Sequence, residues 1–151
     1  MKAFSSSISL VSILVGLGFG QATPNEVSLC LLQQSIRQGE HQPVLTSGKV
    51  DQGELNGGVL FDHACQEMTW LESSLRPQKN TKKLAKIIDR HLQAHVVIEG
   101  EFYGPPDPDP KLPEKFRENY HPNWGHLGCC RTQLVVHRLI DVRPLPRDPE
   151  P

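Results

Sequence analysis

The chain has 151 residues, with 16 Lys and Arg against 17 Asp and Glu and a formal net charge of −1. This length suits one domain with a single core, and the balanced charge excludes the basic footprint of a nucleic-acid binder. The 13 prolines and 12 glycines favour strands and loops over a helical bundle.

Residues 1–22 have the pattern of a secretory signal peptide. Lys2 precedes the apolar run 8–19, which is shorter than the roughly 20 apolar residues that a membrane span needs. Small residues follow, and they allow cleavage after Gly20 or after Ala22. We therefore predict a secreted or periplasmic protein with no transmembrane segment once the signal is removed. An uncleaved N-terminal anchor is the alternative.

Export permits disulfides, and the four cysteines, Cys30, Cys65, Cys129 and Cys130, allow three pairings. Adjacent residues lie only about 3.8 Å apart at Cα, so a Cys129–Cys130 bridge would be strained. We favour a Cys30–Cys65 bridge, which closes a loop of about 36 residues and would contribute roughly 3–4 kcal/mol in the chain-entropy model. The vicinal pair then stays reduced, forms a strained ring or links two chains into a dimer.

Hydrophobic periodicity predicts a helix, three strands, a second helix and two further strands. The predicted helices cover 25–37 and 81–92, and the predicted strands cover 44–51, 59–65, 68–71, 95–103 and 132–142. Three strands, a helix and two strands match an OB-like five-stranded Greek-key barrel. The N-terminal helix would flank this mainly β domain. We assign it to residues 23–143, followed by a flexible proline-rich tail at 144–151.

Several residues have predicted places in this barrel. Gly48 and Gly100 suit the coiling of a small barrel, and Trp70 is expected to anchor the core. His63 is expected to share a strand face with Phe61. Asn80 or Thr81 would cap the second helix.

The second predicted helix has a basic surface, formed by Lys82, Lys83, Lys86 and Arg90. Its apolar stripe is wide enough to face a core, so we favour a solvated basic face on a packed helix. Contact with an anionic surface is the alternative.

The chain resembles a group of small exported bacterial proteins of undefined activity. The resemblance rests on SLCLL at 28–32, DHAC at 62–65, VIEGEF at 97–102, and GHLG at 125–128 followed by the last strand. It implies export, a Cys30–Cys65 pairing and an OB-like core, and it implies no catalytic residues. The group commonly has an aromatic residue where this chain has Cys129 and Cys130, so a role for the vicinal pair would be specific to this chain or its close relatives.

The long irregular stretch 104–131 would join strands 4 and 5, a usual binding loop of OB folds. We predict a ligand platform there. Tyr103, Tyr120 and Trp124 would stack on a small molecule, a glycan or a protein segment, and His121 and His126 would supply hydrogen bonds. The alternative is structural, with Trp124 folded back over the barrel end and the following GHLG sequence serving as a turn.

A metal- or redox-responsive site is the second hypothesis for this loop. His126, Cys129 and Cys130 are candidate ligands for zinc or copper, and the spacing of His126 and Cys129 is workable. A second well-spaced ligand pair is missing from the pattern. We therefore expect no bound metal or cofactor, and keep this function as the alternative.

Catalytic patterns are weak in this sequence. A thiolate–imidazole pair from Cys129 or Cys130 with His126 or His137 has no acidic residue at a spacing that would orient it. Gly57-Gly58 has the setting of a hairpin turn and not of a phosphate-binding loop. We predict a non-enzymatic binding or structural module of the cell envelope.

Overall fold

The computed structural model describes residues 25–50, 55–90, 93–117 and 122–146, without the side chains of Gln66 and Phe116. Its helices and strands are, in chain order, α1 (Leu29–Ser35), β1 (His41–Val50), β2 (Val59–Asp62), β3 (Cys65–Ser73), α2 (Lys79–Asp89), β4 (Gln93–Tyr103), α3 (Glu114–Arg117), the 3₁₀ turn η1 (His126–Gly128) and β5 (Thr132–Leu145). The predicted signal peptide at 1–22 lies outside the described residues. None of the described helices combines the length and hydropathy that a membrane-spanning helix requires.

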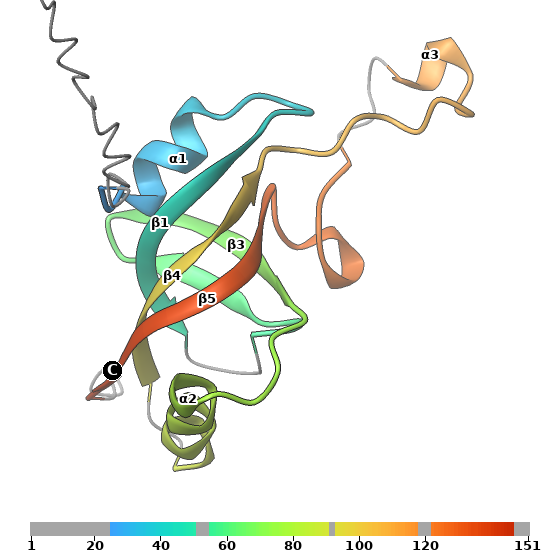
Figure 1. The fold of residues 1–151 in the computed structure, drawn as a ribbon. Helices are drawn as coiled ribbons and strands as arrows, with labels where there is room; N and C mark the ends of the chain where they lie inside the picture. The colour runs from blue at the N-terminus through green and yellow to red at the C-terminus, as the bar shows by residue number, and fades with distance from the viewer. Residues whose placement is uncertain (1–24, 51–54, 91–92, 118–121, 147–151) are drawn as a thin grey trace, which may run out of the picture.

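The five strands close into a barrel in the order β1-β2-β3-β5-β4 (Figure 1). β3 and β5 pair in parallel, and every other neighbouring pair is antiparallel. This is the arrangement of an OB-type barrel. The predicted OB-like barrel, with α2 between strands 3 and 4 and a helix before the first strand, is therefore confirmed.

Strict alternation places one side of β4 inside the barrel. Along β4, every second residue from Ala94 to Phe102 is buried, as a period of two requires. Gly100 is one of them, and a Cβ there would collide with the backbone carbonyl of Val135. The absence of a side chain thus allows β4 and β5 to approach closely next to the register shift between Glu99 and Gly100.

Several predicted boundaries were wrong. β3 runs from Cys65 to Ser73 and is much longer than the predicted 68–71, because β2 turns directly into it. His63 consequently lies in the turn between the two strands and not on a strand face. β5 continues past the predicted end at Val142 to Leu145, since its last residues still pair with the start of β4.

α1 covers one end of the barrel and is fixed there by three kinds of contact. Its apolar residues Leu29 and Leu32 belong to the core. The predicted Cys30–Cys65 disulfide joins it to β3 with a Cα–Cα distance of 5.5 Å, within the usual range. The amide of Gln33, only 2% exposed, also donates from Nε2 to Thr69 Oγ1 at 2.9 Å.

α2 lies at the opposite end of the barrel, against β4 and β5. It begins at Lys79, two residues before the predicted start. The backbone N–H of Gln78 donates to Thr81 Oγ1 at 2.6 Å, so Thr81 serves the first turn from inside the helix and does not cap it. Leu84 and Ile87 are buried, which confirms that the apolar stripe faces the core.

Candidate functional site

The aromatic residues of the barrel lie mostly on its outer surface. Phe102 is the one aromatic side chain among the buried core residues that the structure describes. Phe61, Trp70, Tyr103 and Trp124 are all half-buried and lie outside the barrel. These four rings therefore do little to fill the interior. The role of each ring has to be inferred from its contacts on the outer surface.

Trp70 was wrongly predicted to be a core residue. Its neighbours Thr69 and Leu71 are both fully buried and point into the barrel, so alternation directs Trp70 outward. Thr69 is tolerated inside because its hydroxyl oxygen lies 2.8 Å from Thr132 Oγ1 and also accepts a bond from the Gln33 amide.

Strand pairing aligns the outer residues in one row across the sheet. The registers place Val59 opposite Trp70, Trp70 opposite Gln133, Gln133 opposite Tyr103, and Tyr103 opposite His41. The imidazole of His41 stacks on Tyr103, with ring centroids 5.2 Å apart, and its Nδ1 lies 2.6 Å from Glu101 Oε1. A hollow of about 550 Å³ opens beside His41.

Trp124 joins this row from the loop between β4 and β5. Its ring meets Tyr103 edge to face, with centroids 6.1 Å apart, and its Nε1 donates to the Gly104 carbonyl at 2.8 Å. The structure therefore brings Tyr103 and Trp124 together, as the platform hypothesis requires. The indole also ties the loop to the barrel, as the structural alternative requires. Tyr120 and His121, the other predicted platform residues, lie outside the described residues.

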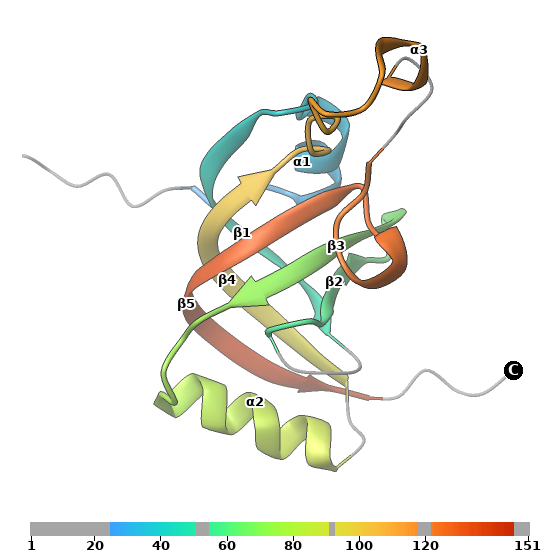
Figure 2. The same ribbon diagram turned by 90° about the vertical axis from the view of Figure 1, so that its right-hand side faces the viewer.

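Residues 124–130 form a short hairpin, here called the 124–130 hairpin, that folds back beside β3 (Figure 2). The backbone N–H of Trp124 donates to the Cys130 carbonyl at 2.7 Å, and the Cys130 N–H donates back at 3.2 Å. Gly125, at φ 80°, lies directly on the Trp70 ring, and a Cβ at this position would overlap the indole. Gln133 is only 6% exposed in the adjoining part of the row.

The tip of the 124–130 hairpin is exposed. Leu127 has a positive φ of 60° and is 93% exposed, and His126 is also exposed. Cys129 and Cys130 form a vicinal disulfide with a Cα–Cα distance of 3.8 Å, which is the ring form among the three predicted states. Their sulfur atoms are bonded to each other in this form and cannot act as thiolate ligands.

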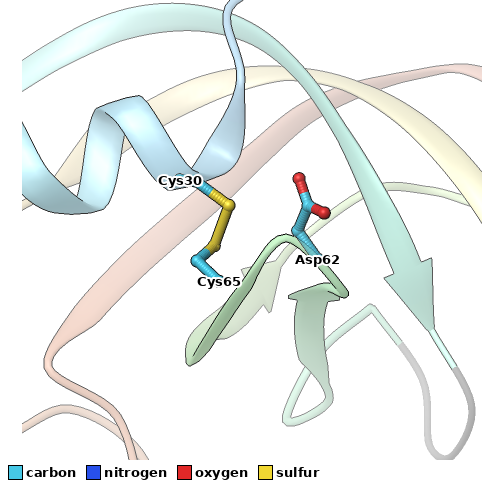
Figure 3. Close-up of side chains that lie close together, drawn as sticks. All are labelled: Cys30, Asp62 and Cys65. Carbon is cyan, nitrogen blue, oxygen red and sulfur yellow. A yellow bond between two sulfur atoms is a disulfide. The ribbon is translucent and has the colours of Figure 1, made fainter.

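One group of three candidate metal ligands lies within 4.8 Å in the described part of the chain, and it consists of Cys30, Asp62 and Cys65 (Figure 3). His126, Cys129 and Cys130 do not form such a group. In the Cys30 group, the two sulfurs are joined as a disulfide. The Asp62 carboxylate accepts a bond from the Ala64 N–H at 2.9 Å, so Asp62 acts as a turn residue here.

The outer surface of the β2–β3 hairpin carries a feature that the sequence reading missed. We call Val59, Phe61, Met68 and Trp70 the β2–β3 face. Phe61 lies opposite Met68 in the strand pairing, and Met68 is 43% exposed. The predicted strand 68–71 already contained the alternation of Met68 and Trp70 with two buried residues, but the assignment of Trp70 to the core reversed its two faces.

Polar groups border the β2–β3 face. The Lys49 ammonium lies 5.7 Å from the centroid of the Phe61 ring, a cation–π distance, and the His63 ring meets Phe61 edge to face at 5.0 Å. Both Gly125 and Gly57 approach Trp70, so the loops after β1 and β4 both border this residue of the face. This is the usual binding surface of an OB fold.

Comparison with protein-family models, curated protein sequences and solved structures gives no significant match to this chain.

Proposed function

We propose that this chain is an exported, non-enzymatic binding module of the cell envelope that holds an oligosaccharide on the β2–β3 face. Export is supported by the N-terminal signal pattern and by the Cys30–Cys65 disulfide, since such bonds persist in oxidising compartments. The near-neutral charge disfavours the other common OB ligand, an oligonucleotide.

The observation that carries this proposal is the pairing of the half-buried Phe61 with the exposed Met68 on the outer surface. Apolar side chains fill the barrel without these two residues, so core packing does not require them. An aromatic ring offers a flat apolar surface on which the C–H face of a sugar can stack. The exposed His63, next to the ring, adds a polar group for sugar hydroxyls.

A glycan binding screen with the mature protein, followed by titration of any ligand found, tests the proposal. Phe61→Ala should weaken binding by about tenfold or more, because truncating a central aromatic residue of a binding site commonly costs at least 1–2 kcal/mol. Leu31→Ala is the matched control, since Leu31 is an exposed apolar residue on α1. Equal losses in both variants, or tight binding that ignores Phe61, would contradict the proposed site.

A second candidate function is thiol-redox response, and the Cys129–Cys130 disulfide favours it. Cys129 is exposed whereas Cys130 is 1% exposed, so an external dithiol would attack the Cys129 sulfur. Attack forms a mixed disulfide and releases the Cys130 thiolate. The second thiol of the reductant then displaces Cys129, which leaves two protein thiols and an oxidised reductant. Because the ring lies at the base of the 124–130 hairpin, its opening would loosen the contact of Gly125 with Trp70.

Thiol counting by mass spectrometry separates the two candidates. A redox function predicts that mild dithiol treatment yields two new thiols at Cys129 and Cys130 while Cys30–Cys65 stays bonded. It also predicts that glycan affinity changes on this treatment and that a Cys129→Ser/Cys130→Ser variant is insensitive to it. Reduction of both disulfides together, or an affinity that does not change, would remove the redox candidate.

A further inference from the structure

The exposed side of α2 carries a straight row of cations. Lys79, Lys83, Lys86 and Arg90 recur at i, i+4, i+7 and i+11, a spacing that places them on one face of a helix. Lys82 lies beside this row. We call these five residues the basic stripe. It spans about 16 Å along the helix, and its residues are exposed whereas Leu84 and Ile87 are buried.

The basic stripe lacks counter-ions within the described part of the chain. None of its residues forms an ion pair with another described residue, and the same holds for Arg76 just before α2. Six of the 16 Lys and Arg of the chain fall in residues 76–90, together with a single acid, Asp89. The chain is close to neutral, so its positive charge is concentrated at the α2 end of the barrel. Such a concentration attracts anionic surfaces.

A groove with a mainly apolar lining runs along the flank of α2 opposite the row at 79, 83, 86 and 90. It has a volume of about 680 Å³ and runs between α2 and the segment that links β3 to it. Its apolar lining consists of Leu55, Leu75, Pro77, Leu84, Ala85 and Ile88. Lys82 and Asp89 are the charged residues of the lining, so Lys82 belongs to both the stripe and the groove. An apolar slot with a cation on its wall matches an amphiphile with an anionic head.

We propose that α2 docks on the surface of an anionic phospholipid bilayer through its exposed side, with lipid phosphates on the basic stripe and an acyl chain in the groove on the other flank of the helix. A nucleic acid or an acidic polysaccharide would satisfy the stripe alone and leave the apolar groove empty. Clusters of Lys and Arg on an amphipathic helix are a recognised mode of anionic-lipid binding. α2 lies at the opposite end of the molecule from α3 (Figures 1 and 2), so the loop between β4 and β5 would point away from the membrane.

Vesicle flotation with the signal-free chain tests this docking. Vesicles made of equal parts phosphatidylglycerol and phosphatidylcholine should bind the protein, pure phosphatidylcholine vesicles should not, and salt should weaken binding. Lys83→Gln/Lys86→Gln should lower the partition coefficient about thirtyfold, since each cation near an anionic surface contributes about fivefold. Lys111→Gln/Arg131→Gln removes the same charge from the other end of the barrel and should change binding less than about twofold.

A groove variant distinguishes lipid from a polyanion. Ala85 is exposed on the groove wall, so Ala85→Glu should preserve folding and lower vesicle binding about tenfold. Inorganic polyphosphate is the competing probe. The proposal is overturned if neutral vesicles bind equally well, if both charge pairs lower binding alike, or if polyphosphate binds tightly while Ala85→Glu leaves vesicle binding unchanged. That last result would identify α2 as a polyanion surface.

Discussion

The interior and the outer β2–β3 face of this barrel use different side chains. The interior is filled by aliphatic residues around a single aromatic, Phe102, and its buried polar side chains are hydrogen-bonded, as Gln33 is to Thr69. The outer face carries Phe61 and Trp70 partly exposed to solvent. Large rings give the most stability when they are fully buried.

This contrast indicates what the outer rings do. Trp70 and Tyr103 support the 124–130 hairpin through Gly125 and Trp124, so part of the aromatic surface is a seat for a loop. Met68 is 43% exposed and Phe61 is half-buried, with Lys49 and His63 beside its ring. We therefore assign loop support to one half of the outer surface and ligand contact to the other.

The largest effect is expected inside the barrel, at Phe102. Phe102→Ala should lower the free energy of unfolding by about 3–5 kcal/mol, because the ring is fully buried and its loss leaves a cavity. Urea denaturation gives this value. Should the variant fail to fold, Phe102→Leu should cost about 1–2 kcal/mol. If Phe102→Ala lost no more unfolding free energy than an outer-ring variant such as Phe61→Ala, the contrast between the interior and the outer face would be contradicted.

The interior also depends on α1, which closes one end of the barrel through Leu29 and Leu32. Cys30→Ser/Cys65→Ser should cost about 3–4 kcal/mol of unfolding free energy, because the bond constrains a loop of about 36 residues in the unfolded chain. Cys129→Ser/Cys130→Ser is the control and should cost about 1 kcal/mol or less, since adjacent residues close almost no loop. Equal losses of unfolding free energy in the two double variants would contradict a special contribution of the Cys30–Cys65 disulfide to the attachment of α1.

An intermediate effect is expected at Trp70, which is outside the barrel but covered by Gly125. Trp70→Ala should cost about 1–2 kcal/mol, as expected for a half-buried ring. Amide hydrogen exchange should rise in the 124–130 hairpin and stay unchanged in β4. Unchanged amide hydrogen exchange in the 124–130 hairpin would mean that Trp70 does not support this hairpin.

The smallest effect on stability is expected at Phe61. Phe61→Ala should lower the free energy of unfolding by about 1 kcal/mol or less, because the ring is only partly buried. The same variant should lose most of its glycan affinity. A large loss of stability would show that Phe61 supports the fold. It would then no longer support the proposal that the β2–β3 face binds a ligand.

Local patterns in the sequence were sufficient to predict the barrel. Alternation in Val96–Phe102 and the helical spacing of Leu84 and Ile87 reflect burial directly, and four cysteines leave few sensible pairings. Trp70 was misplaced because a large ring in a strand suggests a core residue, whereas the buried neighbour is Thr69. Only tertiary partners, here Gln33 and Thr132, make that inward threonine acceptable.

The candidate site was less accessible to sequence reasoning. The sequence pointed to Tyr103 and Trp124, which do meet, but it gave no indication that Gly125 would lie on Trp70. That contact depends on the path of a long loop between β4 and β5, and residue spacing does not determine such a path. The β2–β3 face was missed for a simpler reason: Trp70 was assigned to the core, and a period of two then directs Met68 inward as well.

The methyl resonance of Met68 offers the most direct test of the proposed binding face. The chain has two methionines, Met1 and Met68, so methionine-methyl labelling of the signal-free protein gives a single probe next to Phe61. During titration with an oligosaccharide whose binding is measured independently by calorimetry, this resonance should shift and saturate at the calorimetric stoichiometry. An oligosaccharide that binds while the Met68 methyl group stays unshifted would contradict the assignment of the β2–β3 face as the ligand site.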